Sequence, residues 1–344
     1  MKSAILTESK KPLVIADIEL PKELEFGQVQ VKLFYSGICG AQINEIDALK
    51  GPDKFLPHLL GHEGSGVVEN IGEGVTTVKP GDHVVLHWRK SSGIQSNTAK
   101  YKWNDKIINA GWVTTFNEKA IISENRLTVI PKEADLKTAA LYGCAITSGF
   151  GAVNNDAKVQ IGQSVLIFGL GGMGLSIAYA SSLVSAYPII GIDVHKEKLD
   201  LAKKFGVTHT ILSKDINNYE NIKDILNGKG PDVTFETTGI ASLMEKAYEF
   251  TPDDRKIVFV GVPTEKIKIY TLPLAFNKTL LVSSGGGCVP DIDIPRYIRM
   301  QIDKKLNLDN FITHEFDLDH INEAIELFRS GKAGRIILKI NKKQ

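Results

Sequence analysis

The fold of this chain is decided by one stretch, SVLIFGLGGMGLSIAYASSLV, which runs from residue 164 to residue 184. An apolar run leads into GLGGMG (169–174), and a second apolar run of helical composition follows it. This is the pattern G-x-G-x-x-G between a strand and a helix, the context in which it binds a dinucleotide. Gly169 permits the tight turn, Gly171 lets the backbone approach a pyrophosphate, and Gly174 lets the helix pack against the strand.

The position of one acid predicts which dinucleotide this loop binds. Asp193 lies 19 residues after Gly174, at the end of the next predicted strand. A carboxylate there accepts hydrogen bonds from the adenosine ribose and repels a 2′-phosphate, so we expect NAD rather than NADP. A glycine-rich structural turn beside a surface aspartate is the alternative, and the strand, helix and acid in register argue against it. The predicted NAD-binding residues are Gly169, Gly171, Gly172, Met173, Gly174, Asp193, Lys198 and Val262.

The chain around this motif alternates apolar strands with amphipathic helices, which predicts a doubly wound parallel sheet with helices on both faces. The expected strands are 164–169, 187–193, 208–212, 232–239 and 256–262, with a helix over 196–205. The earlier part of the chain is β-rich, with short apolar runs at 29–37, 64–72 and 82–88. Beyond about residue 284 the alternation fades, until a helix over 320–330 and a strand over 334–340. We expect this tail to rejoin the first β region, which has too few strands to close alone.

Composition excludes several classes of function. With 41 Lys and Arg against 40 Asp and Glu, nothing directs the chain toward nucleic acid or an anionic membrane. Its 3 cysteines are too few and too scattered for a disulfide framework. Residues 164–192 carry no charged side chain, but glycines and a proline divide them into strand, turn, helix and strand. The N-terminus has no signal-peptide pattern, so we expect a cytoplasmic protein that acts on a small molecule.

Three residues far apart in the sequence have side chains that suit a transition metal. Cys39 and Cys144 supply thiolates and His62 supplies an imidazole, a donor set that Zn²⁺ favours. Three protein ligands leave a fourth position for water or a substrate oxygen, as in catalytic zinc sites. From the residue types alone, two buried structural cysteines and a hydrogen-bonded histidine are the more ordinary interpretation.

The segments around these residues resemble the three zinc-ligand segments of the zinc-containing alcohol dehydrogenases, within the medium-chain dehydrogenase/reductase superfamily. They are GICGAQINEI (37–46), LLGHEGSGVVENIGEGVTTVKPGDHVV (59–85) and LYGCAITSGFGA (141–152). The likeness continues through GLGGMG to ITHEFDLDHINEAIELFRSGKAGRIIL (312–338), so it spans almost the whole chain. The segment around His62 is the most specific match, because Gly-His-Glu is followed there by Gly-x-Gly and a Lys-Pro-Gly-Asp turn.

The resemblance implies an α/β enzyme of two domains that transfers a hydride between an alcohol, polyol or sugar-like hydroxyl and NAD. A GroES-like, β-rich catalytic domain would comprise 1–147 and 285–344, and a Rossmann NAD-binding domain would comprise 148–284. The implied zinc ligands are Cys39, His62 and Cys144, with Glu63 behind the metal as an alternate ligand. Arg335 matches the arginine that contacts the NAD pyrophosphate. A homodimer or homotetramer is expected.

The chain departs from the family in three places. Many members have a lobe with four cysteines that binds structural zinc, and residues 88–112 contain no cysteine, so we predict one zinc per chain. Ala41 stands where a Ser or Thr commonly relays the alcohol proton, which leaves Ser148 or a hydroxyl of the substrate as the substitute. Gln42 replaces the acidic partner of the zinc-bound histidine. Its amide is expected to accept a hydrogen bond from the imidazole, with less negative charge than a carboxylate supplies.

The segment in place of the zinc lobe is itself unusual in composition. Residues 88–112 hold all 3 tryptophans of the chain and several lysines and arginines. Trp88 matches a position that lines the family's substrate pocket, so Trp88 and Arg89 are candidates for a wall that contacts a sugar, phosphate or carboxylate. The alternative is that the tryptophans pack under a metal-free loop while the cations face solvent.

Two other functions fit parts of this pattern. A zinc-free enoyl or quinone reductase of the same superfamily would bind the dinucleotide, but it has no need of Cys39, His62 and Cys144. A non-catalytic NAD-binding paralogue is consistent with the missing hydroxyl at Ala41. The substrate stays open, because the sequence does not distinguish a simple alcohol from a polyol or a modified sugar.

Overall fold

The computed structural model describes residues 1–212, 220–263 and 265–341. Contacts divide the chain into two compact units, and each is described by itself. The first unit comprises Met1–Cys144, Val289–Ser330 and Arg335–Gln344. The second comprises Ala145–Cys288 and Gly331–Gly334. The predicted strand over 208–212 ends where the undescribed residues 213–219 begin.

The described residues of the second unit build a six-stranded parallel sheet in the order β13-β12-β11-β14-β15-β16. Its strands are β11 (Val165–Phe168), β12 (Ile189–Asp193), β13 (His209–Leu212), β14 (Val233–Glu236), β15 (Lys256–Phe259) and β16 (Thr279–Val282). The chain order reverses beside β11, between β12 on one side and β14 on the other. In doubly wound sheets ligands bind at the carboxyl ends of the strands at such a switch point.

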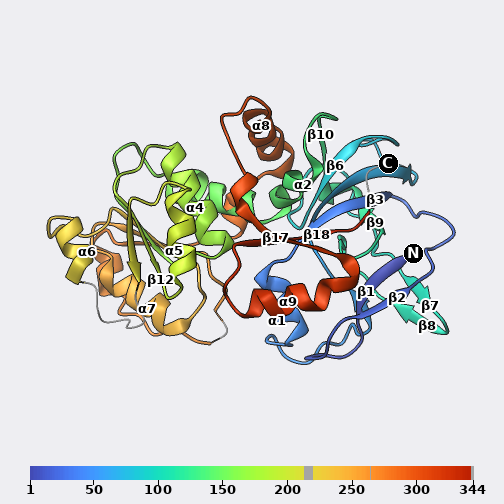
Figure 1. Cartoon of the computed structure of the whole chain (residues 1–344), viewed down its shortest axis with the longest axis horizontal. Helices are drawn as coiled ribbons and strands as arrows, with labels where there is room; N and C mark the ends of the chain where they lie inside the picture. The colour runs from blue at the N-terminus through green and yellow to red at the C-terminus, as the bar shows by residue number, and fades with distance from the viewer. Residues whose placement is uncertain (213–219, 264, 342–344) are drawn as a thin grey trace. The chain divides into compact units, whose positions relative to one another are not determined.

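Helices cover both faces of this sheet (Figure 1), which buries strands that are apolar on both sides. They are α4 (Gly172–Leu183), α5 (Lys196–Lys203), α6 (Glu220–Ile225) and α7 (Ala241–Phe250). Phe168, Ile190 and Ile257 of the sheet pack with Met244 and Tyr248 of α7 in one core cluster. The unit also contains α3 (Ala145–Gly151) and the short turns η3 (Ala152–Ala157), η4 (Leu272–Phe276) and η5 (Gly285–Gly287).

The first unit is β-rich, as its sequence predicts, and its strands pair antiparallel except for β17 and β18, which are parallel. The main sheet runs β10-β6-β5-β3-β18-β17, with β9 also paired to β3. Its strands are β3 (Gln28–Gly37), β5 (Glu63–Ile71), β6 (His83–His87), β9 (Lys119–Ser123), β10 (Leu127–Ile130), β17 (Ile312–Asp317) and β18 (Arg335–Lys339). Leu338 of β18 lies opposite Ser36 of β3 in antiparallel register, so the tail of the chain rejoins the first β region as predicted.

Smaller elements complete the first unit. Two further sheets are formed by β1 (Lys2–Leu6), β2 (Val14–Asp17) and β4 (His58–Leu59), and by β7 (Tyr101–Trp103) with β8 (Lys106–Ile108). The helices are α1 (Gly40–Ile46), α2 (Leu136–Ala139), α8 (Pro290–Ile302) and α9 (Ile321–Arg329). Short turns are η1 (Glu124–Arg126), η2 (Ala140–Gly143), η6 (Asp309–Phe311) and η7 (Leu318–His320).

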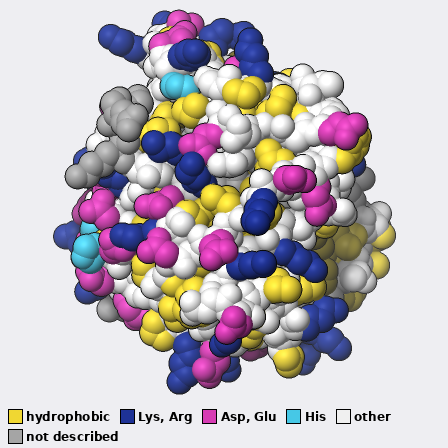
Figure 2. Space-filling view, turned by 90° about the vertical axis from the view of Figure 1, so that its right-hand side faces the viewer, with side chains coloured by type: hydrophobic (Ala, Val, Ile, Leu, Met, Phe, Trp, Pro, Cys, Tyr) yellow, Lys and Arg dark blue, Asp and Glu magenta, His cyan; other side chains and the backbone are white. Residues whose placement is uncertain are grey.

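Several elements were not predicted from the sequence, and two of them lie in or beside the region after the parallel strands. The strand β16 completes the parallel sheet, and the helix α8 begins at Pro290, in the region where the predicted alternation fades. Pro295 inside α8 weakens the helical pattern, because proline lacks the N–H that the helix needs. Within the described ranges, no helix combines the length and the apolar character that a bilayer crossing requires. Figure 2 shows basic and acidic side chains interspersed over the face that it presents, as the near-zero net charge suggests.

Candidate active site

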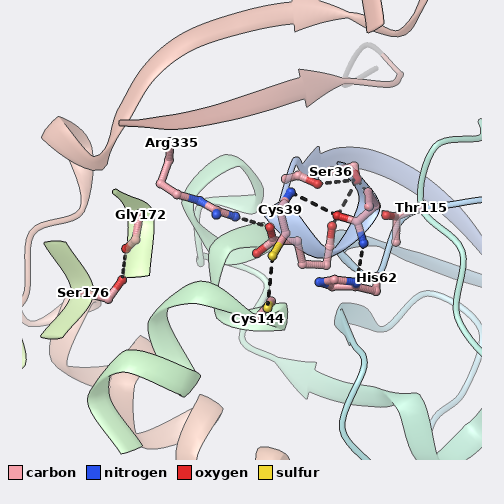
Figure 3. A network of polar contacts seen from close by, with 11 residues as sticks. Ser36, Cys39, His62, Thr115, Cys144, Gly172, Ser176 and Arg335 are labelled. Atoms are coloured by element: carbon pink, nitrogen blue, oxygen red, sulfur yellow. Dashed lines mark hydrogen bonds and ion pairs between the residues drawn. The ribbon is translucent and has the colours of Figure 1, made fainter. Parts of the chain in front are cut away.

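The three predicted zinc ligands come together in the first unit from three separate elements. Cys39 is the N-cap of α1, His62 immediately precedes β5, and Cys144 follows η2. Their ligand atoms all lie within 4.8 Å of one another, with 4.0 Å between the sulfurs of Cys39 and Cys144 (Figure 3). Two thiolates at about 2.3 Å from a tetrahedral zinc are spaced about 3.8 Å apart, so this separation fits the ion.

The imidazole of His62 supplies the second test of that fit. Its Nε2 atom is buried and has no hydrogen-bond partner among the described residues. Its other nitrogen, Nδ1, contacts the side-chain amide of Gln42. A buried polar atom without a partner is costly, and a metal ion bound to Nε2 removes that cost. The donor set and the orphaned nitrogen therefore fit zinc better than a pair of structural cysteines.

Electrostatics at the two thiols favour one deprotonated sulfur. The Cys144 thiol, hydrogen-bonded to Cys39, holds the pKa of Cys39 well below its ordinary value, and His62 and Arg335 add to this. The same hydrogen bond, together with burial, raises the pKa of Cys144. The two sulfurs of Cys39 and Cys144 thus share one proton. A metal cation bound between them would replace that proton.

Glu63 and Arg335 form a buried ion pair near the predicted zinc ligands. The guanidinium Nη2 of Arg335 bonds to Oε1 of Glu63, whose side chain is fully buried. A Cβ atom at Gly37 would lie 2.6 Å from that carboxylate, and one at Gly143 would lie 2.8 Å from the Glu63 Cβ. Glycine at position 37 therefore leaves room for the carboxylate, and glycine at position 143 leaves room for the backbone of Glu63 and Leu86. The contact of Arg335 with an NAD pyrophosphate stays a prediction.

The glycine-rich loop of the second unit has the shape that its sequence predicts. Gly169 has φ +84°, a backbone conformation that favours glycine. A Cβ at Gly174 would lie 1.9 Å from the carbonyl oxygen of Gly169, so the start of α4 packs against the turn only because this residue is glycine. A Cβ at Gly171 would meet no atom within 4 Å, so open space adjoins its backbone.

Asp193 joins this loop to the end of β12. One carboxylate oxygen accepts the N–H of Leu170 at 2.8 Å, and the other accepts the N–H of His195 at 2.9 Å. Those two bonds hold the carboxylate in place beside the glycine turn. The remaining predicted cofactor residues lie on three different elements. Gly172 and Met173 begin α4, Lys198 is half-buried on α5, and Val262 is exposed beyond β15.

Comparison with known proteins assigns the family. The alcohol dehydrogenase GroES-like domain matches residues 25–132, and the zinc-binding dehydrogenase family matches residues 169–302. The chain is 33% identical to the class-3 alcohol dehydrogenase of Drosophila melanogaster, over 98% of this chain and 97% of that protein. It belongs to the zinc-containing alcohol dehydrogenase family. It is therefore an NAD-linked, zinc-dependent oxidoreductase that acts on a hydroxyl group, with an α/β fold of a GroES-like and a Rossmann-like part.

Other relatives of this alcohol dehydrogenase extend over similar lengths. The S-(hydroxymethyl)glutathione dehydrogenase of Escherichia coli is 32% identical, with 98% of this chain and 99% of the relative covered. The benzyl alcohol dehydrogenase of Acinetobacter calcoaceticus has a crystal structure that superposes with a TM-score of 0.88 at 27% identity, over 99% of both chains. The family's chemistry requires Zn²⁺ and NAD.

The structure reverses the expected hydrogen bond between Gln42 and His62. The amide oxygen of Gln42 accepts the backbone N–H of Cys39 at 3.0 Å. The amide nitrogen, which is a donor, faces Nδ1 of His62. The prediction that Gln42 accepts a hydrogen bond from the imidazole is wrong in this structure, because the amide oxygen already accepts the backbone N–H of Cys39, the N-cap residue of α1.

The segment that replaces the family's cysteine lobe is held by a residue that the sequence did not point to. Glu124, buried in η1, accepts the N–H of Ile94 with Oε2 at 2.7 Å. Its Oε1 accepts the N–H groups of Thr76 and Thr77 at 2.7 and 2.8 Å, and the Thr77 hydroxyl at 2.9 Å. One carboxylate thus joins this segment to a neighbouring turn. A single glutamate in a β-rich stretch carries no sequence signal for such a role.

The predicted relay and substrate residues have different surroundings. Ser148 is buried in α3, in the second unit, and Ala41 is exposed in the first turn of α1. Trp88 follows β6 and is 36% exposed, and the Arg89 guanidinium lies 5.7 Å from the centre of its ring. Trp112, at the other end of the segment, stacks with Arg126 in the same manner, at 5.5 Å. Trp88 and Trp112 are thus both exposed beside arginines, whereas Trp103 packs against a core cluster of the first unit.

A second group of possible metal ligands lies near α1 and was also missed. Glu45, Asp53 and His58 have ligand atoms within 4.8 Å of one another. His58 is already partnered, with Nε2 at 2.7 Å from Asp53 and Nδ1 at 3.0 Å from the carbonyl of Leu59. Because both imidazole nitrogens have partners, these residues are an ion-paired cluster, in contrast to the orphaned His62.

Proposed function

We propose that this alcohol dehydrogenase holds one zinc ion per chain at Cys39, His62 and Cys144, and binds NAD at GLGGMG (169–174) with Asp193 on the ribose. A zinc ion bound there would act as a Lewis acid toward the substrate oxygen. The observation that carries the proposal is the convergence of two sulfurs 4.0 Å apart with a buried, unpartnered imidazole nitrogen. Glu63 is proposed as an alternate ligand behind the metal, and Arg335, which is ion-paired with Glu63, is proposed to contact the NAD pyrophosphate.

Metal analysis of purified protein tests this stoichiometry. We expect about one zinc per chain, and we expect Cys144→Ser to lose the ion and the alcohol-dependent formation of NADH together. Two zinc ions per chain would contradict the proposal and direct attention to Glu45, Asp53 and His58. A zinc-free protein that still reduces an enone or a quinone would show the alternative reductase chemistry.

We propose that Ser148 accepts the alcohol proton in place of the absent hydroxyl at Ala41. If so, Ser148→Ala should lower turnover by about 10²–10³-fold, the size of a general acid–base step, with little change in NAD affinity. If a neighbouring hydroxyl of the substrate serves as the relay, Ser148→Ala should be mild, vicinal diols should outperform simple alcohols, and Ala41→Ser should raise activity on simple alcohols. A neutral Ser148→Ala without any gain from Ala41→Ser would leave neither relay in place.

The substrate is proposed to contact Trp88 and Arg89, which together offer an aromatic face and a cation. The relatives' names suggest a panel: benzyl alcohol and S-(hydroxymethyl)glutathione, with polyols and sugar phosphates added for the cation. Arg89→Leu should raise the KM of anionic substrates selectively, because a guanidinium binds carboxylates and phosphates with paired hydrogen bonds. An equal change for neutral alcohols would place Arg89 outside the substrate site.

We further propose a homodimer or homotetramer assembled through the open edge of β16. This strand ends the parallel sheet, and exposed apolar side chains accompany it: Tyr270, Leu272, Phe276 and Val282. An unpaired edge with exposed apolar residues favours pairing with a second copy. Val282→Lys should shift the mass measured by light scattering toward the monomer, whereas a wild-type monomer would refute the assembly.

We also propose a cytoplasmic location. The proposed domain limits are 1–147 with 285–344 for the catalytic domain and 148–284 for the NAD-binding domain, and limited proteolysis tests these limits.

A further inference from the structure

The side chain of Gln42 contacts two of the zinc ligands at once. It is 2% exposed on α1, its amide oxygen accepts the N–H of Cys39 at 3.0 Å, and its amide nitrogen faces Nδ1 of His62. An amide has one acceptor side and one donor side. In this arrangement the acceptor side contacts Cys39 and the donor side contacts His62, so each side of the amide contacts a different predicted metal ligand.

The direction of these contacts fixes the tautomer of the imidazole. Because Nδ1 of His62 faces a donor, Nδ1 must carry the lone pair, and the ring proton must lie on Nε2. Nε2 is the buried nitrogen that has no partner among the described residues. A histidine that ligates zinc through Nε2 needs the opposite tautomer, with the lone pair on Nε2 and the proton on Nδ1.

Binding of zinc therefore requires Gln42 to change its hydrogen bonds. With the proton on Nδ1, the amide must turn so that its oxygen accepts from His62. The amide nitrogen then faces the backbone N–H of Cys39, and two donors oppose each other at the N-cap of α1. A carboxylate of the same shape accepts from both groups at once, because both of its oxygens are acceptors.

We infer that Gln42 is a positioning residue that limits zinc affinity in this enzyme, because its amide can satisfy either the Cys39 N–H or the Nδ1–H of a metal-bound His62. This inference rests on the proposed zinc site and concerns how tightly that site holds its metal. Partners of metal-bound histidines typically change metal affinity by about 10–100-fold, which sets the expected scale.

Chelator competition on the folded, full-length protein tests the inference through zinc affinity alone. We expect Gln42→Glu to bind zinc about 10–100-fold more tightly than wild type. Gln42→Met, which removes both hydrogen bonds, should bind zinc no better than wild type. Asn44→Asp is the matched control, because it adds the same charge on α1, where Asn44 is half-buried, whereas the side chain of Gln42 contacts Cys39 and His62. A residue with only a structural role would show no gain on changing glutamine to glutamate.

Two spectroscopic measurements distinguish failure of the inference about Gln42 from failure of the proposed zinc site. Histidine ¹H–¹⁵N correlation of the zinc-loaded wild type should place the ring proton of His62 on Nδ1, and that of the metal-free protein on Nε2. Co²⁺ substitution should give thiolate charge-transfer absorption in wild type and Gln42→Glu. If that absorption is normal and the affinities of wild type, Gln42→Glu and Asn44→Asp are equal, the inference is overturned and the zinc site stands. Absence of the absorption in every variant overturns both.

Discussion

The guanidinium of Arg335 on β18 is ion-paired with the carboxylate of Glu63 on β5, and both side chains are buried. The two residues are 272 positions apart in the chain. Burial lowers the pKa of Arg335, but Glu63 and the two thiols outweigh it and raise the net value, so the guanidinium stays charged. The Nε atom of Arg335 has no partner among the described residues. The pair thus places a guanidinium, balanced by the Glu63 carboxylate, near the metal ligands.

Removing one partner of this pair should be more harmful than removing both. Arg335→Met leaves the carboxylate of Glu63 buried without its cation, which should lower the free energy of unfolding by about 3–5 kcal/mol. The double variant with Glu63→Gln should recover much of that loss, because no uncompensated charge remains. Urea unfolding of the single and double variants measures both the loss of unfolding free energy in Arg335→Met and its recovery in the double variant. Additive losses in the double variant would mean that the two side chains do not interact as the structure describes.

Replacing Asp193 should weaken the preference for NAD. The carboxylate should favour NAD over NADP by about 1–3 kcal/mol, or roughly 5- to 150-fold, through hydrogen bonds to the ribose and repulsion of a 2′-phosphate. Asp193→Ser should reduce the ratio of kcat/KM for the two cofactors. Asp200→Ser, on the exposed side of α5, is the control for a lost surface charge. A wild-type enzyme that prefers NADP would refute the proposal that Asp193 selects NAD.

Replacing Glu124 should loosen the segment over residues 88–112. Glu124→Gln keeps the shape but substitutes a donor for one oxygen, which opposes N–H groups now held at 2.7–2.8 Å. Since hydrogen bonds to a charged group contribute about 1.5–3 kcal/mol each, we expect a loss of about 2–4 kcal/mol in the free energy of unfolding. Thermal unfolding and hydrogen exchange at Ile94 measure it. Glu73→Gln, at an exposed position, should change neither.

Stability should fall in mild acid because of His87. Burial lowers the pKa of this histidine to about 4, and its ring bonds to the carbonyl of Arg89 and the hydroxyl of Thr128. The unfolded chain takes up the proton near pH 6.5, so the stability that His87 contributes is complete above that pH and is lost as the pH falls toward 4. The shift corresponds to about 3 kcal/mol.

The comparison of wild type with His87→Gln isolates the contribution of His87 to the pH dependence of the free energy of unfolding. The variant keeps a polar side chain but cannot titrate, so its unfolding free energy should decline less between pH 7 and pH 4. Other groups that titrate in this range are common to both proteins and cancel in the difference. Parallel pH profiles would show that His87 is protonated equally in the folded and unfolded chains.

The sequence alone determined the parts of this protein that depend on local pattern. The strand, glycine turn and helix of residues 164–184 are all present, because the spacing of apolar residues and the need for glycine at positive φ act within a few residues. The parallel sheet followed from the alternation of such units. The strand β16 and the helix α8 escaped prediction; in α8, Pro295 interrupts the helical pattern.

Tertiary structure decided which distant side chains meet and in which orientation. The three zinc ligands could be named from family resemblance, but the ion pair between Arg335 and Glu63, the four hydrogen bonds of Glu124 and the donor face of Gln42 toward His62 could not. Periodicity reports which face of an element is buried, and it carries no information about pairing between elements that are hundreds of residues apart. Nor does it say which end of an amide turns toward a metal ligand, because that choice depends on where the backbone N–H of Cys39 lies in space.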